Sequence, residues 1–339
     1  MCNHINSTSI KEITKPFSIK NNRLAFAILV FDILVYLILI ANCIAVDSII
    51  VKIIISFVLG IAIAFLFIIG HDCCHNSFTS NRKLNTYLGV LCFMPSLHNF
   101  KLWELGHNKT HHAFSNLKSK DYVYTPMTKA EYDRLSPFKR FEYRVYRSVI
   151  GHMLYYLIEI WCKKMIIPHK GIVNIKDAKS YNKFNYGILI YVCIIATYIY
   201  FISIFFGKAF FVELLFSMVI PFLAFNWLMG FVIYQHHTNL DTRWFENEEE
   251  WNYWESQIEN SVHITFPKPL NFVLHNIMEH TAHHVNMNIP LYNLNDAQAK
   301  LETTFGTKIK TVNWSIKYYW QSIRKCKLYD YEEHRWLIF

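Results

Sequence analysis

Histidine is the residue type in this sequence whose number and spacing suggest chemistry. The chain has 17 histidines, and several of them form four tight groups. The groups read HDCCH, HNKTHH, QHH and HTAHH. Their members are His71 and His75; His107, His111 and His112; His236 and His237; and His280, His283 and His284. Neutral imidazole binds zinc, copper, iron and nickel, so the groups predict metal binding.

The spacing within two groups fits ligands that project from helices. Residues i and i+4 lie on one face of an α-helix. We therefore expect His71 and His75 to aim at one point, and His107 and His111 to do the same.

The HH doublets of the second and fourth groups indicate more than one metal ion. Neighbouring residues of a helix point about 100° apart, so His111 points away from His112 and His283 away from His284. Eight or nine imidazoles are about twice the number that a zinc site needs. The sequence has no HExxH pattern and no cysteines at zinc-finger spacing. Two adjacent metals beside apolar segments favour redox chemistry on a hydrophobic substrate.

Other polar residues have simpler interpretations. Asp72 follows His71 and either orients that ligand or is solvated. The histidines outside the groups are expected to be ordinary hydrogen-bonding or surface residues: His4, His98, His152, His169, His263, His275 and His334.

Long apolar stretches predict that the chain spans a membrane. Hydrophobic residues make up 53% of the chain and charged residues 17%, against about 25% charged in a soluble domain. Four stretches are close to the roughly 20 residues that a membrane helix needs: 24–46, 49–70, 186–206 and 209–234. Residues 84–95 and 149–161 are shorter and are expected to be interfacial or re-entrant. Asp32, Lys52 and Glu213 should occupy end turns or buried faces.

The four spans are expected to form two hairpins. Only two residues separate the spans of each pair, so residues 1–23, 71–185 and 235–339 should lie on one side of the membrane. Of the 34 Lys and Arg residues, all but Lys52 and Lys208 fall in these segments, which makes that side cytoplasmic. The segmentation predicts an all-α, multi-pass membrane protein with spans in 24–70 and 186–234 and a cytoplasmic helical domain that carries the histidines. The net charge of +9 is then explained by basic residues that gather on the cytoplasmic side of a membrane. No nucleic-acid partner is therefore expected.

The histidine motifs and their flanks resemble the membrane fatty acid desaturase family over roughly residues 55–300. The shared stretches are GHDCCHNSF, LWELGHNKTHH and HNIMEHTAHHVNMNIPLYNL, although Cys74 stands where many relatives have glycine. The resemblance implies two iron ions held by eight histidines, with a ninth ligand from just after the last span. His236 is the expected ninth ligand, and His237 is the alternative. The other eight are His71, His75, His107, His111, His112, His280, His283 and His284.

The resemblance also implies an activity and partners. We expect an O2-dependent enzyme that desaturates a fatty acyl chain carried on a lipid, on CoA or on a carrier protein. The sequence has no dinucleotide-binding, haem-attachment or ferredoxin-type cysteine motif, so electrons should come from a separate ferredoxin or cytochrome. A related di-iron hydroxylase or ketolase of a lipid, alkane or carotenoid stays an alternative. A zinc membrane hydrolase or a metal transporter is less favoured, because a transporter would hold its ligands near the middle of the membrane.

Overall fold

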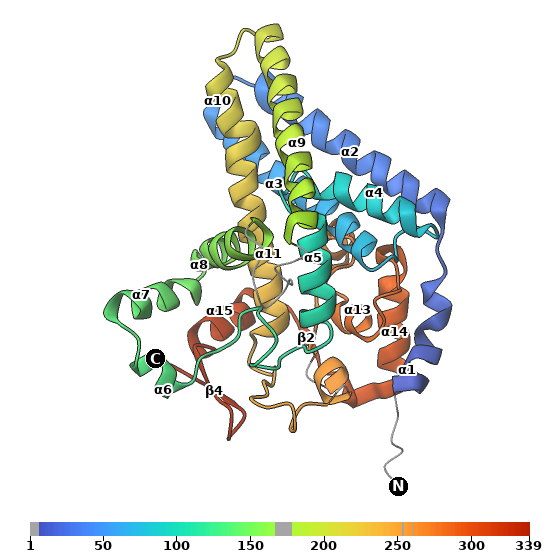
Figure 1. Cartoon of the computed structure of the whole chain (residues 1–339), viewed down its shortest axis with the longest axis vertical. Helices are drawn as coiled ribbons and strands as arrows, with labels where there is room; N and C mark the ends of the chain where they lie inside the picture. Colours follow the sequence, from blue (N-terminus) through green and yellow to red (C-terminus); the bar gives the residue numbers. More distant parts are fainter. Residues whose placement is uncertain (1–6, 167–177, 253, 260) are drawn as a thin grey trace. The chain divides into compact units, whose positions relative to one another are not determined.

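The computed structural model describes residues 7–166, 178–252, 254–259 and 261–339. Two compact units, which alternate along the chain, make up the fold (Figure 1). The head unit comprises Met1–Lys20, Gly106–His152 and Phe231–Phe339, and the span unit comprises Asn21–Leu105 and Met153–Gly230. His4 and His169 lie outside the described residues.

Four helices are long and apolar enough to cross a membrane, as predicted. They are Asn22–Ala45 (α2), Ile49–Cys74 (α3), Asn185–Phe205 within α9 (Ala178–Phe205), and Phe210–His237. The last one consists of α10 (Phe210–Leu214), the π-helical segment η5 (Leu215–Val219) and α11 (Ile220–His237). The four spans and the mainly helical fold are confirmed. The ends differ from the predicted ones by four residues or fewer, because helical hydrogen bonding continues past the apolar stretch into the first and third histidine groups.

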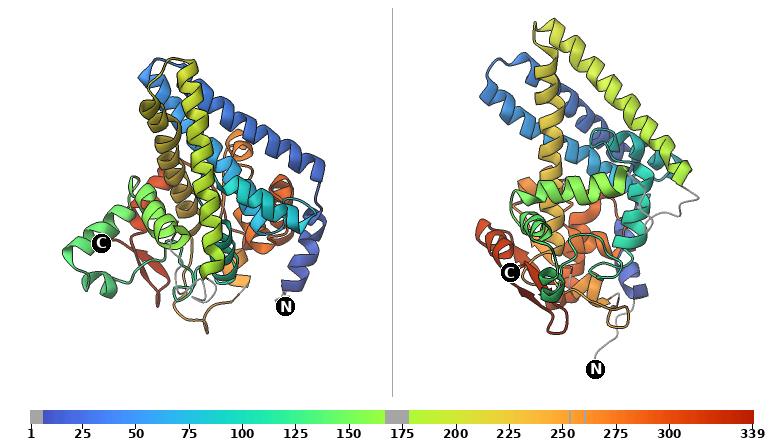
Figure 2. Two further views of the ribbon diagram at one scale, coloured as in Figure 1. Left: turned by 45° about the horizontal axis from the view of Figure 1, so that its top comes forward. Right: turned by 60° about the vertical axis from the view of Figure 1, so that its left-hand side comes forward.

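The turns of the two hairpins lie at the same end of the span unit. The first hairpin begins at Asn21, whose side chain caps α2 by accepting from the Leu24 amide at 3.1 Å. The second hairpin turns at Gly207, whose φ of +65° favours glycine. Lys208 in that turn forms an ion pair with Asp47 in the first turn. Figures 1 and 2 show α10 leaving the turn that ends α9, and the two helices pack on each other.

Helix α3 is the innermost span. Within its most apolar stretch 61% of the residues are buried, against 17% in α9. It packs on α2 and on α4 (Arg82–Phe93). A Cβ atom added at Gly60 would come within 2.6 Å of Ala224 Cβ, so glycine permits a close approach of α3 to α11. α3 thus gives the first histidine group, at its carboxyl end, a rigid and buried support.

The charged residues within the spans are buried, as expected. Lys52 Nζ lies 2.6 Å from Glu213 Oε2 and donates to the Cys43 carbonyl at 2.7 Å. Asp32 is 1% exposed. The two shorter apolar segments are helical: residues 84–95 fall mostly in α4, and residues 149–161 fall in α8 (Gly151–Tyr155) and the π-helical η3 (Tyr156–Ile166).

The head unit consists of short elements. In chain order they are α1 (Ser7–Thr14), η1 (Lys15–Ser18), η2 (His107–His111), α6 (Lys129–Asp133), α7 (Pro137–Tyr146), η6 (Glu255–Glu259), β1 (His263–Thr265), α12 (Lys268–Val273), α13 (His280–Val285), η7 (Leu291–Asn293), α14 (Leu294–Phe305), η8 (Gly306–Lys308), β2 (Thr311–Asn313), α15 (Ile316–Lys325), β3 (Leu328–Asp330) and β4 (Arg335–Leu337). α5 (Phe100–Gly106) precedes η2.

Two small sheets and the N-terminal helix tie these elements together. β1 pairs parallel with β2, and β3 pairs antiparallel with β4. α1 packs on α13 and α14, and Asn286 just after α13 donates to Thr14 Oγ1 at 2.9 Å. Because a six-residue helix is not stable alone, α13 depends on this packing.

Candidate metal centre

Three buried histidines of the head unit converge on one point. His111 comes from η2, His237 from the end of α11 and His284 from α13. One ring nitrogen from each lies within 4.8 Å of the other two. Ligands at about 2.1 Å from a metal ion lie no more than about 4.2 Å apart, so a small contraction would bring all three onto one ion. We call these residues the histidine trio.

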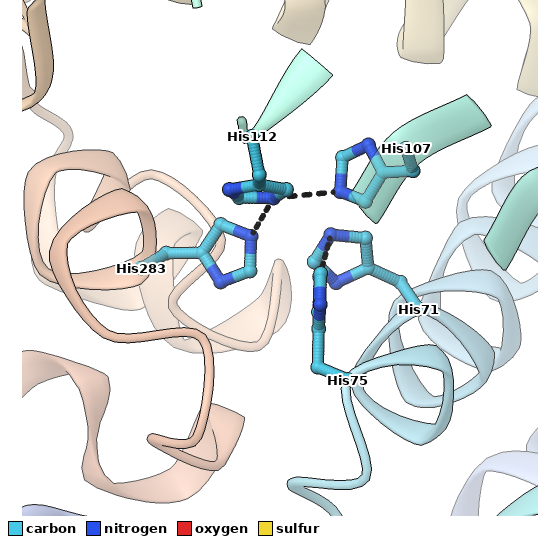
Figure 3. A group of neighbouring side chains, drawn as sticks. All are labelled: His71, His75, His107, His112 and His283. Atoms are coloured by element: carbon cyan, nitrogen blue, oxygen red, sulfur yellow. Dashed lines mark hydrogen bonds between the residues drawn. The ribbon is translucent and has the colours of Figure 1, made fainter. Parts of the chain in front are cut away.

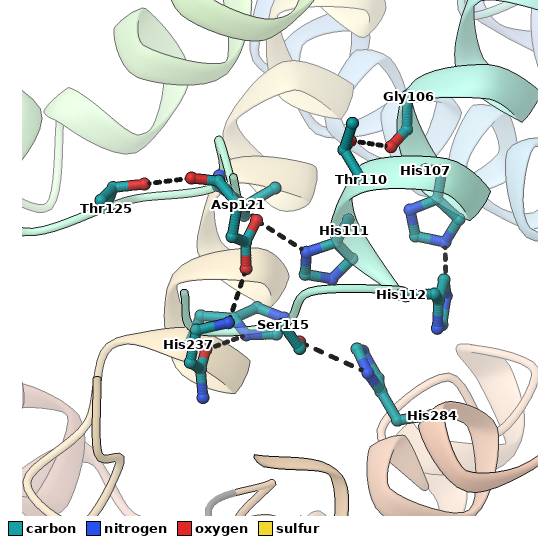
Figure 4. Close-up of polar contacts among 12 residues, drawn as sticks. Gly106, His107, Thr110, His111, His112, Ser115, Asp121, Thr125, His237 and His284 are labelled. Carbon is teal, nitrogen blue, oxygen red and sulfur yellow. Dashed lines mark hydrogen bonds and ion pairs between the residues drawn. The ribbon is translucent and has the colours of Figure 1, made fainter. Parts of the chain in front are cut away.

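Each ring of the trio is oriented through its Nδ1 atom by an oxygen of a neighbouring side chain, and Figure 4 shows the contact of His111 with Asp121. His111 Nδ1 donates to Asp121 Oδ1 at 3.0 Å. The corresponding acceptors are Asn116 Oδ1 at 3.1 Å for His237 and Gln257 Oε1 at 2.8 Å for His284. With the proton on Nδ1, the lone pair is on Nε2, which is the arrangement that a metal-binding imidazole needs.

A second convergence in the head unit involves His112 and His283, the neighbours of His111 and His284 in their HH doublets. His112 Nε2 lies 3.0 Å from His107 Nε2 and 3.0 Å from His283 Nε2. The doublets therefore point apart as predicted, since the Nε2 atoms of His112 and His283 lie next to each other, whereas His111 and His284 offer their ring nitrogens to the trio.

The expectation that His107 and His111 aim at one point is wrong. η2 is π-helical, and the His112 amide bonds to the His107 carbonyl at 2.9 Å across five residues. In a π-helix the residue five positions along shares the face. His107 thus pairs with His112, while His111 belongs to the trio.

The first histidine group lies in the span unit, in the last turn of α3. His71 Nε2 and His75 Nε2 are 3.4 Å apart, and both rings are buried. This pair aims at one point as the i, i+4 spacing predicts. Figure 3 draws His71 and His75 together with His107, His112 and His283 of the head unit.

His280 and His236 lie beside the trio. His280 Nε2 is 3.1 Å from His237 Nε2, and the His236 ring stacks on the His280 ring at 3.7 Å between centroids. Burial, together with the neighbouring imidazoles, holds the pKa of His280 well below its usual value. His280 is therefore neutral, as a metal ligand must be.

Asp72 lies near its neighbouring ligand candidate, at ion-pair rather than hydrogen-bond distance. Asp72 Oδ1 lies 3.6 Å from His71 Nδ1, beyond hydrogen-bond length. Its side chain is buried, so the alternative that it is simply solvated is wrong.

The isolated histidines in the described residues lie outside both convergences. His98 donates to the Ser96 carbonyl at 2.7 Å, and His152 bonds to Tyr319 Oη at 2.8 Å. His263 is different, because its ring lies between two carboxylates, Glu279 and Glu302. Burial lowers its pKa, but the hydrogen bonds to these carboxylates prevail and raise it to about 9.

The sequence did not point to Asp121, Asn116 or Gln257, the residues that orient the trio. Asp121 and Asn116 follow the second histidine group within ten residues, which is a weak signal. Gln257 lies in a π-helical segment between the last two groups, and it also donates to the His112 carbonyl at 3.0 Å. No motif distinguishes it from a surface glutamine.

The donor set fits a metal ion of the imidazole-binding class. The atoms that converge are ring nitrogens of buried histidines. Among the described residues the groups contain no cysteine thiolate, so the arrangement favours iron, copper, zinc or nickel bound by nitrogen. The converging ring nitrogens of the head unit fall into two groups.

Comparisons with known proteins found similar sequences. The family model described as "Fatty acid desaturase" matches residues 48–315. A chloroplastic omega-6 fatty acid desaturase of Glycine max is 26% identical over 279 residues, which are 81% of this chain and 62% of the relative. An sn-1 oleoyl-lipid 12-desaturase of Picosynechococcus sp. is 28% identical, over 84% of this chain and 78% of the relative.

An sn-1 oleoyl-lipid 12-desaturase of Arthrospira platensis is 32% identical over 240 residues, 69% of this chain. The chain spans less than two thirds of the length of the Glycine max and Arthrospira relatives, 62% and 64%.

Proposed function

This chain belongs to the fatty acid desaturase family, and we propose that it uses O2 to introduce a double bond into a fatty acyl chain. The observation that carries the proposal is the buried histidine trio, with the Nδ1 atom of every ring held by a side-chain oxygen. Such a set is suited to metal binding and has no evident use in a passive membrane protein.

We propose that the substrate is the acyl chain of a membrane lipid. Three relatives are named for oleoyl-lipid or omega-6 desaturation. The four apolar helices are consistent with a substrate taken from the bilayer. In the balanced reaction, one –CH2–CH2– unit, O2, two electrons and two protons yield –CH=CH– and two water molecules.

We propose two iron ions as the metal. Their ligands are proposed to be His71, His75, His107, His111, His112, His280, His283 and His284, with the ninth from His236 or His237. Membership of His237 in the trio supports His237 for that place, whereas His236 stacks on His280. Bound iron would activate O2 as the oxidant that an unactivated methylene requires, a chemistry that acid–base groups lack.

The protein's own residues hold the imidazoles in one tautomer and exclude water. Asp121, Asn116 and Gln257 keep a proton on Nδ1 of three rings, so that Nε2 faces the metal position. Each ring of the trio is at most 4% exposed. A dry site protects a strong oxidant from side reactions with solvent.

The reaction needs an electron donor, and we propose a separate ferredoxin or cytochrome that docks on the cytoplasmic side. The proposed topology has residues 1–23, 71–185 and 235–339 on that side, with the spans in residues 24–70 and 186–234. The ion pair between the two hairpin turns supports it, because both turns must then lie on one side of the membrane.

Expression in a host that accumulates oleoyl lipids tests the function. Mass spectrometry of the fatty acids should show an acyl chain that has lost two hydrogens. A His284→Ala variant, which removes one ring of the trio, should give no product. A product that has gained an oxygen atom would instead identify a hydroxylase or ketolase.

A further inference from the structure

A buried network supports the helix that carries the last histidine group. Glu279 directly precedes α13, and its Oε2 atom lies 2.8 Å from His263 Nε2. The other ring nitrogen, His263 Nδ1, contacts Glu302 Oε1 on α14. His263 and Glu279 are each 4% exposed. One imidazole on β1 thus joins the start of α13 to α14.

Further hydrogen bonds anchor both carboxylates. Glu279 Oε1 accepts from Asn271 Nδ2 of α12 at 2.6 Å. Glu302 Oε1 accepts from Gln298 Nε2 at 3.1 Å. Gln298 then returns to α13, because its Oε1 atom accepts from the Ala282 amide at 2.9 Å. The network therefore contacts α13 at two points, at Glu279 just before its first turn and at the Ala282 amide in its middle.

We propose that His263 is a positioning residue: held between Glu279 and Glu302, it fixes α13 and through α13 the aim of His280, His283 and His284. The part of this inference that concerns metal rests on the proposed function. His263 lies in neither histidine convergence, so its role differs from ligation. The sequence-based expectation for His263 was an ordinary hydrogen-bonding or surface residue, and the proposed role goes beyond it.

The physical reason lies in the length of α13 and in the charges around His263. A helix of six residues has too few internal hydrogen bonds to hold its own axis, so side-chain contacts determine its orientation. Removing the imidazole would leave the buried carboxylate of Glu279 without its cationic partner, near the partly exposed carboxylate of Glu302, and burial weakens the screening of that charge. α14 and the start of α13 would then separate, and the three rings of α13 would lose their common aim.

The test compares two variants of buried histidines in the full-length protein. We call the bridge from Glu279 through His263 to Glu302 the clamp. His263→Leu removes it. His152→Leu is the matched control, because His152 is 0% exposed and also bonds through both ring nitrogens, to Tyr319 and Tyr124, but is not part of this network. The first readout is hydrogen exchange of amides 280–286 in the metal-free protein. We expect exchange at least about tenfold faster in His263→Leu and unchanged in His152→Leu.

The second readout is metal affinity, measured with Co²⁺ as a spectroscopic probe in competition with a chelator. His263→Leu should bind about 10–100-fold more weakly, while His152→Leu should match the natural protein. A natural protein that binds no metal would overturn the di-iron proposal, whereas the exchange measurement would still decide on the clamp. Unchanged exchange in His263→Leu, or equal acceleration in both variants, would overturn the clamp.

A milder variant decides the case in which His263→Leu does not fold. Glu302→Gln weakens the clamp from the α14 side and changes no residue next to a histidine of α13. It should accelerate exchange of amides 280–286 and lower Co²⁺ affinity in the same direction, by a smaller factor. Glu302→Gln with exchange equal to that of the natural protein would overturn the proposal.

Discussion

An imidazole can give a metal only the nitrogen that carries no proton, so the partner of the other nitrogen determines whether a histidine is a useful ligand. Asp121 has this role for His111. Its carboxylate accepts from three N–H groups: His111 Nδ1 at 3.0 Å, the Val123 amide at 3.1 Å and the Asn116 amide at 2.9 Å. An asparagine cannot accept at both ends, because one end of its amide is a donor.

Asp121→Asn should therefore weaken metal binding about 10–100-fold. The measurement is iron per chain after titration with a chelator. Asp133→Asn is the control, since that carboxylate only pairs with exposed Lys129 at 2.6 Å. Equal iron retention in the two variants would contradict the assigned role of Asp121.

The QHH doublet gives a second prediction at this scale. The sequence-based expectation was His236, with His237 as the alternative, although neither spacing nor residue type separates adjacent histidines at the end of a helix. The side-chain partners do separate them, since Asn116 orients His237 while His236 lies flat on His280. His237→Ala should lose iron and product, and His236→Ala should keep most of both. Metal analysis with fatty-acid profiling distinguishes the two, and the reverse pattern would assign the ninth ligand to His236.

Among the helices, the sequence predicted the spans, which depend on the length of apolar stretches. It missed the features that depend on local hydrogen bonding. Four spans could be recognised because a run of about 20 apolar residues matches the thickness of the hydrocarbon core of a membrane. The π-helical η2 could not, because the periodicity argument assumed 3.6 residues per turn. One extra residue in that turn exchanges the partners of His107. The orienting residue Gln257 was likewise hidden, because its function depends on a contact with His284 across 27 residues.

The buried ion pair between α3 and α10 yields a prediction about these elements. Lys52→Met should destabilise the protein by about 3–5 kcal/mol, because it leaves Glu213 as an uncompensated buried charge. The double variant Lys52→Met/Glu213→Gln should recover most of that loss. Thermal unfolding in detergent measures both, with Lys208→Met as the control. That lysine pairs with Asp47, which is 90% exposed, so its loss should cost less than about 1 kcal/mol. Equal destabilisation of the single and double variants would contradict a pairing role for Lys52.

For the whole molecule, the distribution of charge and the hairpin turns determine how the chain is threaded through the membrane. Only Lys52 and Lys208, of 34 basic residues, lie outside the three segments proposed to be cytoplasmic. The charge of Lys208 is balanced by its ion pair with Asp47, and the charge of Lys52 is balanced by its ion pair with Glu213. Neither residue therefore weakens the positive-inside argument.

Reporter fusions test this threading. Fusions at Ser48 and Lys208 should report export, because the positive-inside argument places the turns opposite the cytoplasm and the Lys208–Asp47 pair requires both turns on one side. A fusion at Lys300 should report the cytoplasm, together with the histidine groups, where a soluble electron donor can reach them. An internal check comes from the first two fusions, which must agree whatever the orientation. Opposite signals at Ser48 and Lys208 would contradict the paired turns themselves. Export at Lys300 would instead reverse the orientation of the whole protein and exclude a cytoplasmic donor.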